Sequence, residues 1–108
     1  MIRRGDLVTV AVQGDYGKPR PALVLQSDLF SEHPGITLCL LTSKLHDAPL
    51  MRLTLDPTPE NGLRERSQVQ IDKIITVSRA KVAGPIGRVE DKVLVEVSRA
   101  LALWLGIA

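Results

Sequence analysis

The alternation of apolar and polar residues predicts a chain of short strands followed by one helix. The segment "DLVTVAV" at 6–12 alternates as a strand does, and "RPALVLQ" at 20–26 predicts a second strand. The run "ITLCLLTS" at 36–43 is almost uniformly apolar, which is typical of a central strand that is covered on both faces. Glycine, proline and aspartate predict intervening loops at 14–18, 27–35 and 56–62.

The second half of the chain continues this pattern. Further strands are expected at 51–55, 67–71 and 74–78, with a short one near 86–89. In 51–55, Met51, Leu53 and Leu55 share one face. In 67–71, alternation predicts that Val69 and Ile71 point inward and that Gln68 and Gln70 point outward.

The period changes near the end of the chain, where one helix is expected. In "EDKVLVEVSRALALWLG" apolar residues recur on one helical face, and Gly106 is expected to end the helix. The residues on that face are Leu94, Val97, Leu101, Trp104 and Leu105. Many short strands followed by a helix predict a mainly β fold. We expect a small barrel or a strongly bent sheet, in one domain over residues 1–108.

Composition narrows the class of protein. The chain has 108 residues, is 44% hydrophobic and carries a net charge of +2, which permits an acidic or nucleic-acid partner. Its single cysteine, Cys39, lies in an apolar run and is expected to be a buried hydrophobe. With no internal disulfide, no signal peptide and no membrane span recognised, we expect a cytoplasmic protein without a membrane partner.

Most familiar catalytic patterns are missing from the sequence. His33 and His46 lack the spacing of metal ligands, and "GDYGKPR" does not match a phosphate-binding loop, so no metal or cofactor is expected. Polar groups at strand ends remain as candidates. Arg20 begins a strand between two prolines, and Thr42 ends another.

Arg20 and Thr42 suit one particular reaction if strand ends meet at one rim of the sheet. A guanidinium fork and a hydroxyl would stabilise the extra negative charge of a phosphorane. RNA brings its own nucleophile, the 2′-hydroxyl, so such a site needs neither a metal nor an activated serine. The alternative is structural: Arg20 extends along the surface beside Pro21, and Thr42 caps a strand end.

The chain resembles the MazF/PemK-like toxins of type II toxin–antitoxin systems over nearly its whole length. Five segments carry the resemblance in the family's order, which makes it specific. They are "RRGDLVTV" (3–10), "RPALVLQSD" (20–28), "LLTSK" (40–44), "SQVQIDKIITVSRAKVAGPIGRV" (67–89) and "ALWLGIA" (102–108).

The resemblance implies an SH3-like small barrel with a C-terminal helix, a homodimer, and a metal-independent endoribonuclease that cuts single-stranded RNA. It also implies a cognate antitoxin whose flexible acidic segment blocks the RNA groove. Arg20 and Thr42 match the family's catalytic arginine and hydroxyl, although Ser43, one residue away, could exchange roles with Thr42. Asp72 matches the family's acid and is expected to be a catalytic base or an RNA contact. The expected substrate-binding residues are Asp15, Tyr16, Lys18, Ser43, Lys44, Gln70 and Lys73.

Some features depart from the family or leave alternatives open. Gln70 stands where some PemK-type members carry a second catalytic arginine, and Lys73 replaces the usual glutamine after Asp72. The ending "WLGIA" is close to the "WGI" of CcdB-like gyrase inhibitors, which share the fold, so gyrase inhibition is the alternative function. A third possible function is that of a binding module without catalytic activity. Positive charge dominates 64–88 and predicts a basic groove for RNA and antitoxin.

Overall fold

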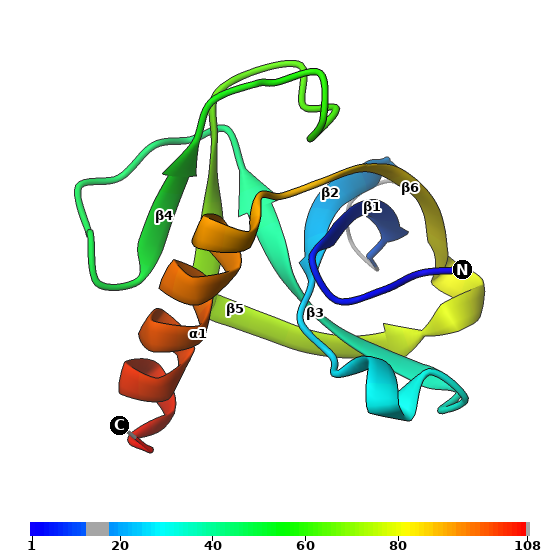
Figure 1. Ribbon diagram of the computed structural model, residues 1–108. Coiled ribbons are helices and arrows are strands. Elements are labelled where there is room, and N and C mark those ends of the chain that lie inside the picture. The colour runs from blue at the N-terminus through cyan, green and yellow to red at the C-terminus, as the bar shows by residue number, and fades with distance from the viewer. Residues whose placement is uncertain (13–17, 108) are drawn as a thin grey trace.

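The computed structural model describes residues 1–12 and 18–107, which form six strands and one α-helix (Figure 1). The strands are β1 (Asp6–Ala11), β2 (Pro19–Val24), β3 (Gly35–Thr42), β4 (Arg52–Leu55), β5 (Ser67–Ser78) and β6 (Val82–Arg88). The 3-10 turns η1 (Asp28–Phe30) and η2 (Arg79–Lys81) precede β3 and β6, and α1 (Asp91–Leu105) ends the fold.

All paired strands are antiparallel, in the order β4-β5-β3-β2-β1-β6. The sheet curls so that β1, β2, β3 and β6 surround a small interior, as seen near the centre of Figure 1. Among the described strands β4 and β6 remain edges, so the sheet resembles a small barrel without closing into one. The predicted mainly β fold with a C-terminal helix is therefore confirmed, as a strongly bent sheet.

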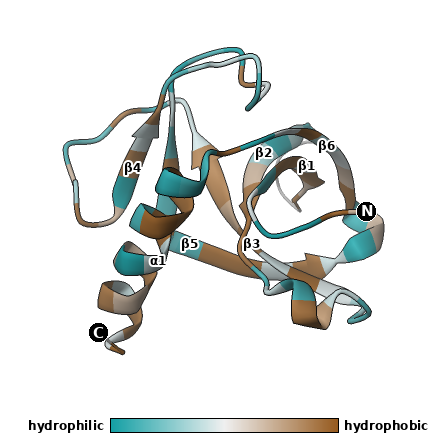
Figure 2. Ribbon diagram, viewed as in Figure 1, coloured by the Kyte–Doolittle hydropathy of each residue, from teal (hydrophilic) through white to brown (hydrophobic). Residues whose placement is uncertain are grey.

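Both faces of the central strand β3 are buried, which explains its nearly continuous apolar run. In β3, Leu38 and Leu40 contribute to a core inside the curl, whereas Cys39 and Leu41 contribute to a second core on the face covered by α1. In Figure 2 the hydrophobic residues of β1 and β3 appear in brown. Burial, together with the nearby charge of Asp72, raises the pKa of the Cys39 thiol to about 12, as expected for an inert buried cysteine.

The helix α1 buries only part of its apolar face. Val97 is fully buried against the sheet, and Gly106 ends the helix with a φ of 73°. Trp104 is 50% exposed and Leu105 is 59% exposed, so the predicted stripe packs in its first half and faces outward in its last turn. No helix among residues 1–12 and 18–107 is long and apolar enough to cross a bilayer.

The region 67–78 differs from the two short strands expected there. It forms the single strand β5, and its pairing with β3 shifts register between Cys39 and Leu41. The prediction that Gln68 and Gln70 point outward is wrong, because only 4% and 7% of these residues are exposed.

Hydrogen bonds explain why the two glutamines are buried. The Gln70 side chain donates to the Leu40 carbonyl, 3.4 Å away, at the point where the β3–β5 pairing shifts register. The Gln68 side chain both accepts from the His46 N–H and donates to the His46 carbonyl, at 2.9 Å each. An amide has the same donor and acceptor pair as a peptide group, so each glutamine takes the place of missing backbone partners.

The loop between β4 and β5 packs backbone to backbone against β6. A Cβ atom added to Gly62 would lie 2.1 Å from the Ile86 carbonyl oxygen, and one added to Gly87 would lie 2.2 Å from the Asn61 carbonyl. The Arg88 N–H donates to the Glu60 carbonyl at 2.8 Å. Glycine is therefore required on both sides of this contact.

We expect Gly87→Ala to destabilise the protein by about 3 kcal/mol, because the added methyl group forces two backbones apart. Gly106→Ala is the control for steric contact: its φ of 73° is unfavourable for alanine, but nothing lies within 4 Å, whereas Gly87 is limited by the contact alone. The expected cost of Gly106→Ala is about 1 kcal/mol. Urea unfolding of both variants measures the difference, and equal midpoints would show that the Gly87 contact is not tight.

Candidate active site

A groove of about 900 Å³ lies between the ends of β2 and β3 and the loop that joins β4 to β5. In Figure 1 that loop, green at the top, arches over the end of the molecule toward which β3 runs. The lining residues include Arg20 on β2, Thr42 at the end of β3, Ser43 and Lys44 just after it, and Arg64 on the loop. The groove thus collects polar groups from segments far apart in the sequence.

Arg20 and Thr42 come together because of the strand register. In the β2–β3 pair, Ala22 is opposite Leu40 and Leu23 is opposite Cys39. Continuing this antiparallel register by two residues places Arg20 beside Thr42, and both line the groove. The Arg20 side chain is half-buried at the start of the strand, between Pro19 and Pro21, which restrict its backbone.

The hydroxyl of Thr42 is held in a defined position. Its oxygen accepts a hydrogen bond from the Lys44 N–H at 3.1 Å, in the turn that follows β3. One lone pair is used in this way, and the hydroxyl proton and the other lone pair can serve a ligand. Ser43 also lines the groove but is exposed, so the geometry favours Thr42 over Ser43 as the positioned hydroxyl.

The groove contains residues outside the predicted catalytic and substrate-binding sets, although Arg64 belongs to the segment that the sequence predicted to be basic. Arg64 and Glu65 line it from the loop, and Ser67 lines it at the start of β5. Among the described lining residues, three side chains are cationic, Arg20, Lys44 and Arg64, and Glu65 is the one acid. The sequence feature that indicates this side of the groove is the Asn61-Gly62 turn, because it brings residues 63–65 back over the sheet.

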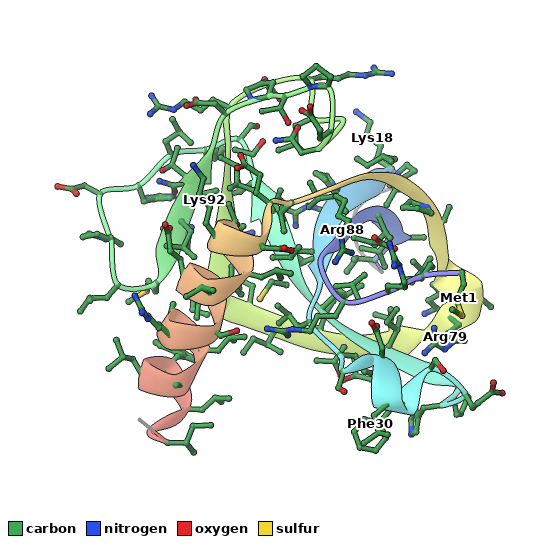
Figure 3. All side chains as sticks on the ribbon, in the orientation of Figure 1. Met1, Lys18, Phe30, Arg79, Arg88 and Lys92 are labelled. Carbon is green, nitrogen blue, oxygen red and sulfur yellow. The ribbon has the colours of Figure 1, made fainter. Side chains whose placement is uncertain are left out.

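The other predicted substrate-binding residues lie elsewhere or are not described. Asp15 and Tyr16 fall outside the described residues. Lys18 is exposed beside the start of β2, as Figure 3 shows, and Lys73 is exposed on β5. Gln70 is buried against Leu40, and neither Gln70 nor Lys73 lines the groove. Their roles in binding remain predictions.

Asp72 lies outside the groove, in an ion pair with Arg52 of the edge strand β4. The Arg52 guanidinium donates to both carboxylate oxygens, at 3.1 and 3.2 Å, and the side chains are 13% and 18% exposed. Burial alone would raise the pKa of Asp72, but the hydrogen bonds and charge of Arg52, helped by Lys73, hold it below its usual value. The contacts of Asp72 thus favour a structural role over the predicted catalytic one.

We expect Asp72→Asn to lower the free energy of unfolding at pH 7 by about 2 kcal/mol, because Arg52 loses a charged partner. The pKa of Asp72 is lowered in the folded state. Its contribution is therefore present above the pKa of the unfolded chain and is lost as pH falls through the folded value. Wild type and variant should converge in urea unfolding at low pH. Asp47→Asn, at an exposed position, is the control, and loss of activity with unchanged stability would instead support catalysis.

The expected basic groove from 64–88 needs a correction, because several of its arginines are engaged elsewhere. Arg88 pairs with Asp6 at 3.0 Å, Arg66 pairs with Asp56 at 3.1 Å, and Arg79 donates to the His33 carbonyl. The Arg88 backbone contacts the loop, but its side chain donates to the Arg4 carbonyl and to Asp6, on the N-terminal segment and not in the groove. Of the basic residues in 64–88, Arg64 alone lines the groove, so its positive charge comes mainly from other segments.

Together these features define a small β protein with a groove in which a guanidinium and a hydroxyl can hold one phosphate. No cluster of three or more histidine, cysteine, aspartate or glutamate side chains suited to a metal is found in the described ranges. A family model described as the PemK-like, MazF-like toxin of type II toxin–antitoxin systems matches residues 3–105. The chain therefore belongs to this toxin family.

Individual relatives agree with this assignment. The chain is 43% identical over 108 residues to a protein named "Probable endoribonuclease MazF" from Mycolicibacterium smegmatis, with 99% of each covered. A MazE–MazF crystal structure from Deinococcus radiodurans matches with a TM-score of 0.80 and 26% identity over 99% of this chain and 97% of that one. A mycobacterial endoribonuclease in complex with its cognate antitoxin shares the fold, with a TM-score of 0.82 at 20% identity, covering 100% of this chain and 98% of that one.

These findings confirm the predicted family and the predicted class of activity, an endoribonuclease toxin. The names of the relatives give the alternative of a gyrase inhibitor no support. Trp104, Leu105 and Ile107 are half-exposed or more, so this part of the "WLGIA" ending lies on the surface, but no finding connects it with gyrase.

Proposed function

We propose that this toxin cuts single-stranded RNA without a metal, at the groove that holds Arg20 and Thr42. The observation that supports the proposal is the convergence of these two residues, from different strands, on one groove of about 900 Å³. A groove of this kind admits an extended strand, and its cations, Arg20, Lys44 and Arg64, suit a chain of phosphates.

In the proposed reaction the 2′-oxygen of one ribose attacks the adjacent phosphorus. A base takes the 2′-hydroxyl proton, the new P–O2′ bond closes a ring, and the P–O5′ bond breaks. The leaving 5′-oxygen gains a proton. The products are a 2′,3′-cyclic phosphate and a 5′-hydroxyl end, so no water and no metal-bound nucleophile enters this step.

The two residues act on the charge that develops during the attack. The phosphorane carries an additional negative charge on its non-bridging oxygens, and the fork of Arg20 fits two of them. The Thr42 hydroxyl, oriented by Lys44 N–H, donates a further hydrogen bond. Prolines on both sides hold the Arg20 backbone before RNA arrives, which reduces the reorganisation that the reaction requires.

We also propose partners for this chain. MazE bound to MazF in the Deinococcus radiodurans structure, together with the family, supports a cognate antitoxin with a flexible acidic segment that enters the cationic groove. The exposed apolar residues Leu103, Trp104 and Leu105 at the end of α1 suit contact with a second copy in a homodimer. We place the toxin in the cytoplasm, where messenger RNA is available.

The test of this function is cleavage of a long single-stranded RNA by the purified protein in excess EDTA. We expect cuts at defined sites, with cyclic phosphate and 5′-hydroxyl ends in the products. A supercoiling assay with gyrase runs in parallel. Inhibited supercoiling without RNA cleavage would instead support the alternative, and neither activity would support a binding module.

A further inference from the structure

The groove has two walls of different chemistry. One wall carries Arg20 and Thr42 at the strand ends, and the other is the segment 63–65, which presents Arg64 and Glu65. The carboxylate of Glu65 repels phosphates at its own position, whereas Arg64 beside it can hold a neighbouring phosphate of the strand. A nucleotide has its phosphate and its base on opposite sides of the ribose. A strand whose phosphates contact Arg20 therefore turns base edges toward the wall at 63–65.

This second wall is held rigidly. Asn61 is 6% exposed, and its side-chain oxygen accepts hydrogen bonds from Thr58 N–H and Leu63 N–H, each 3.0 Å long. Its amide donates to the Asp56 carbonyl at 2.9 Å. At the other end, the hydroxyl of Ser67, a residue only 4% exposed, donates to the Glu65 carbonyl at 2.9 Å.

The backbone contact with β6 completes this support. Gly62 lies so close to Ile86 that no side chain fits between them, and Gly87 lies equally close to Asn61. The segment 63–65 is therefore anchored at both ends and from behind, while Glu65 itself is exposed to the groove. A fixed backbone limits the positions that the Glu65 carboxylate can reach, and so favours ligands with a matching donor over poorly matched ones.

We propose that Glu65 is a specificity-determining residue that reads a base next to the cut, with Asn61 and Ser67 as its positioning residues. This inference rests on the proposed ribonuclease function. A carboxylate accepts hydrogen bonds from N–H groups, which guanine, adenine and cytosine offer through their exocyclic amines. Uracil presents carbonyl oxygens on both sides of its one N–H group, which the carboxylate repels. The preferred base is therefore one that carries an exocyclic amine.

The experiment maps cuts made in a random single-stranded RNA pool by wild type, Glu65→Gln and the matched control Glu60→Gln. Glu60 is exposed in the same loop but does not line the groove. We expect Glu65→Gln to reduce the preference for amine-bearing bases over uracil at one position roughly tenfold. Glu60→Gln should cut as wild type does.

A binding measurement separates this inference from the proposed cleavage. The pool is bound to Arg20→Ala protein, with and without Glu65→Gln, and the retained sequences are compared. A shift in retained bases supports the inference even if no cutting is seen. Unchanged preferences in cut and bound RNA overturn it while leaving the ribonuclease intact. Uniform loss of cutting without a shift in preference would assign Glu65 to the chemistry instead, and absence of both binding and cutting would overturn both proposals.

Discussion

Arg20→Ala is expected to lower the rate of RNA cleavage by about 10²–10³-fold, with the fold preserved. The magnitude is that of removing one preorganised donor from a developing oxyanion. Arg20 lies at a strand start in the groove, where its fork would meet the phosphorane oxygens. The loss should appear mainly in kcat, because the extra charge exists only in the transition state.

Single-turnover cleavage of a defined RNA measures this effect, and thermal unfolding reports on the fold. Arg99→Ala, at an exposed position on α1, removes the same charge away from the groove and is the control. Arg20→Lys keeps the charge but loses the fork, so partial activity is expected. If Arg20→Ala unfolds the protein, the arginine has a structural role, and cleavage at the wild-type rate would show that the site lies elsewhere.

A substrate with a 2′-deoxyribose at the cut position should show no detectable cleavage. The proposed nucleophile is absent from it, and the groove supplies only groups that stabilise charge and move protons. The same RNA with the deoxyribose placed two nucleotides away is the control and should be cut normally. Denaturing gels of both substrates decide the matter, since a cut at the deoxy position would require another nucleophile.

The sequence predicts most of the strands and several of the polar residues that line the groove. Alternation located β1 and β2, and the uniform run at 36–43 correctly indicated the central strand β3, because both of its faces are buried. The sequence also singles out Arg20 and Thr42, because each is a polar residue at the start or end of an apolar run.

The failures have a common physical origin. Gln68 and Gln70 alternate with Val69 and Ile71 in the same way as surface residues. Their amides are useful in the interior only because Gln70 meets the shifted β3–β5 pairing and Gln68 meets the backbone of His46. The partners of Asp72 and Arg88 are Arg52 and Asp6, each far away along the chain. Pairing between distant charges depends on the register of the sheet, which local patterns do not contain.

The two open edges of the sheet bear on how copies of this protein behave when crowded. An edge strand presents unpaired N–H and C=O groups that can recruit a strand from another molecule and start fibre growth. Here β4 is only four residues long and carries Arg52, while β6 contains Pro85, which has no N–H to donate. These features disfavour polymerisation through the backbone, so association is left to side-chain surfaces whose shape and charge select the partner.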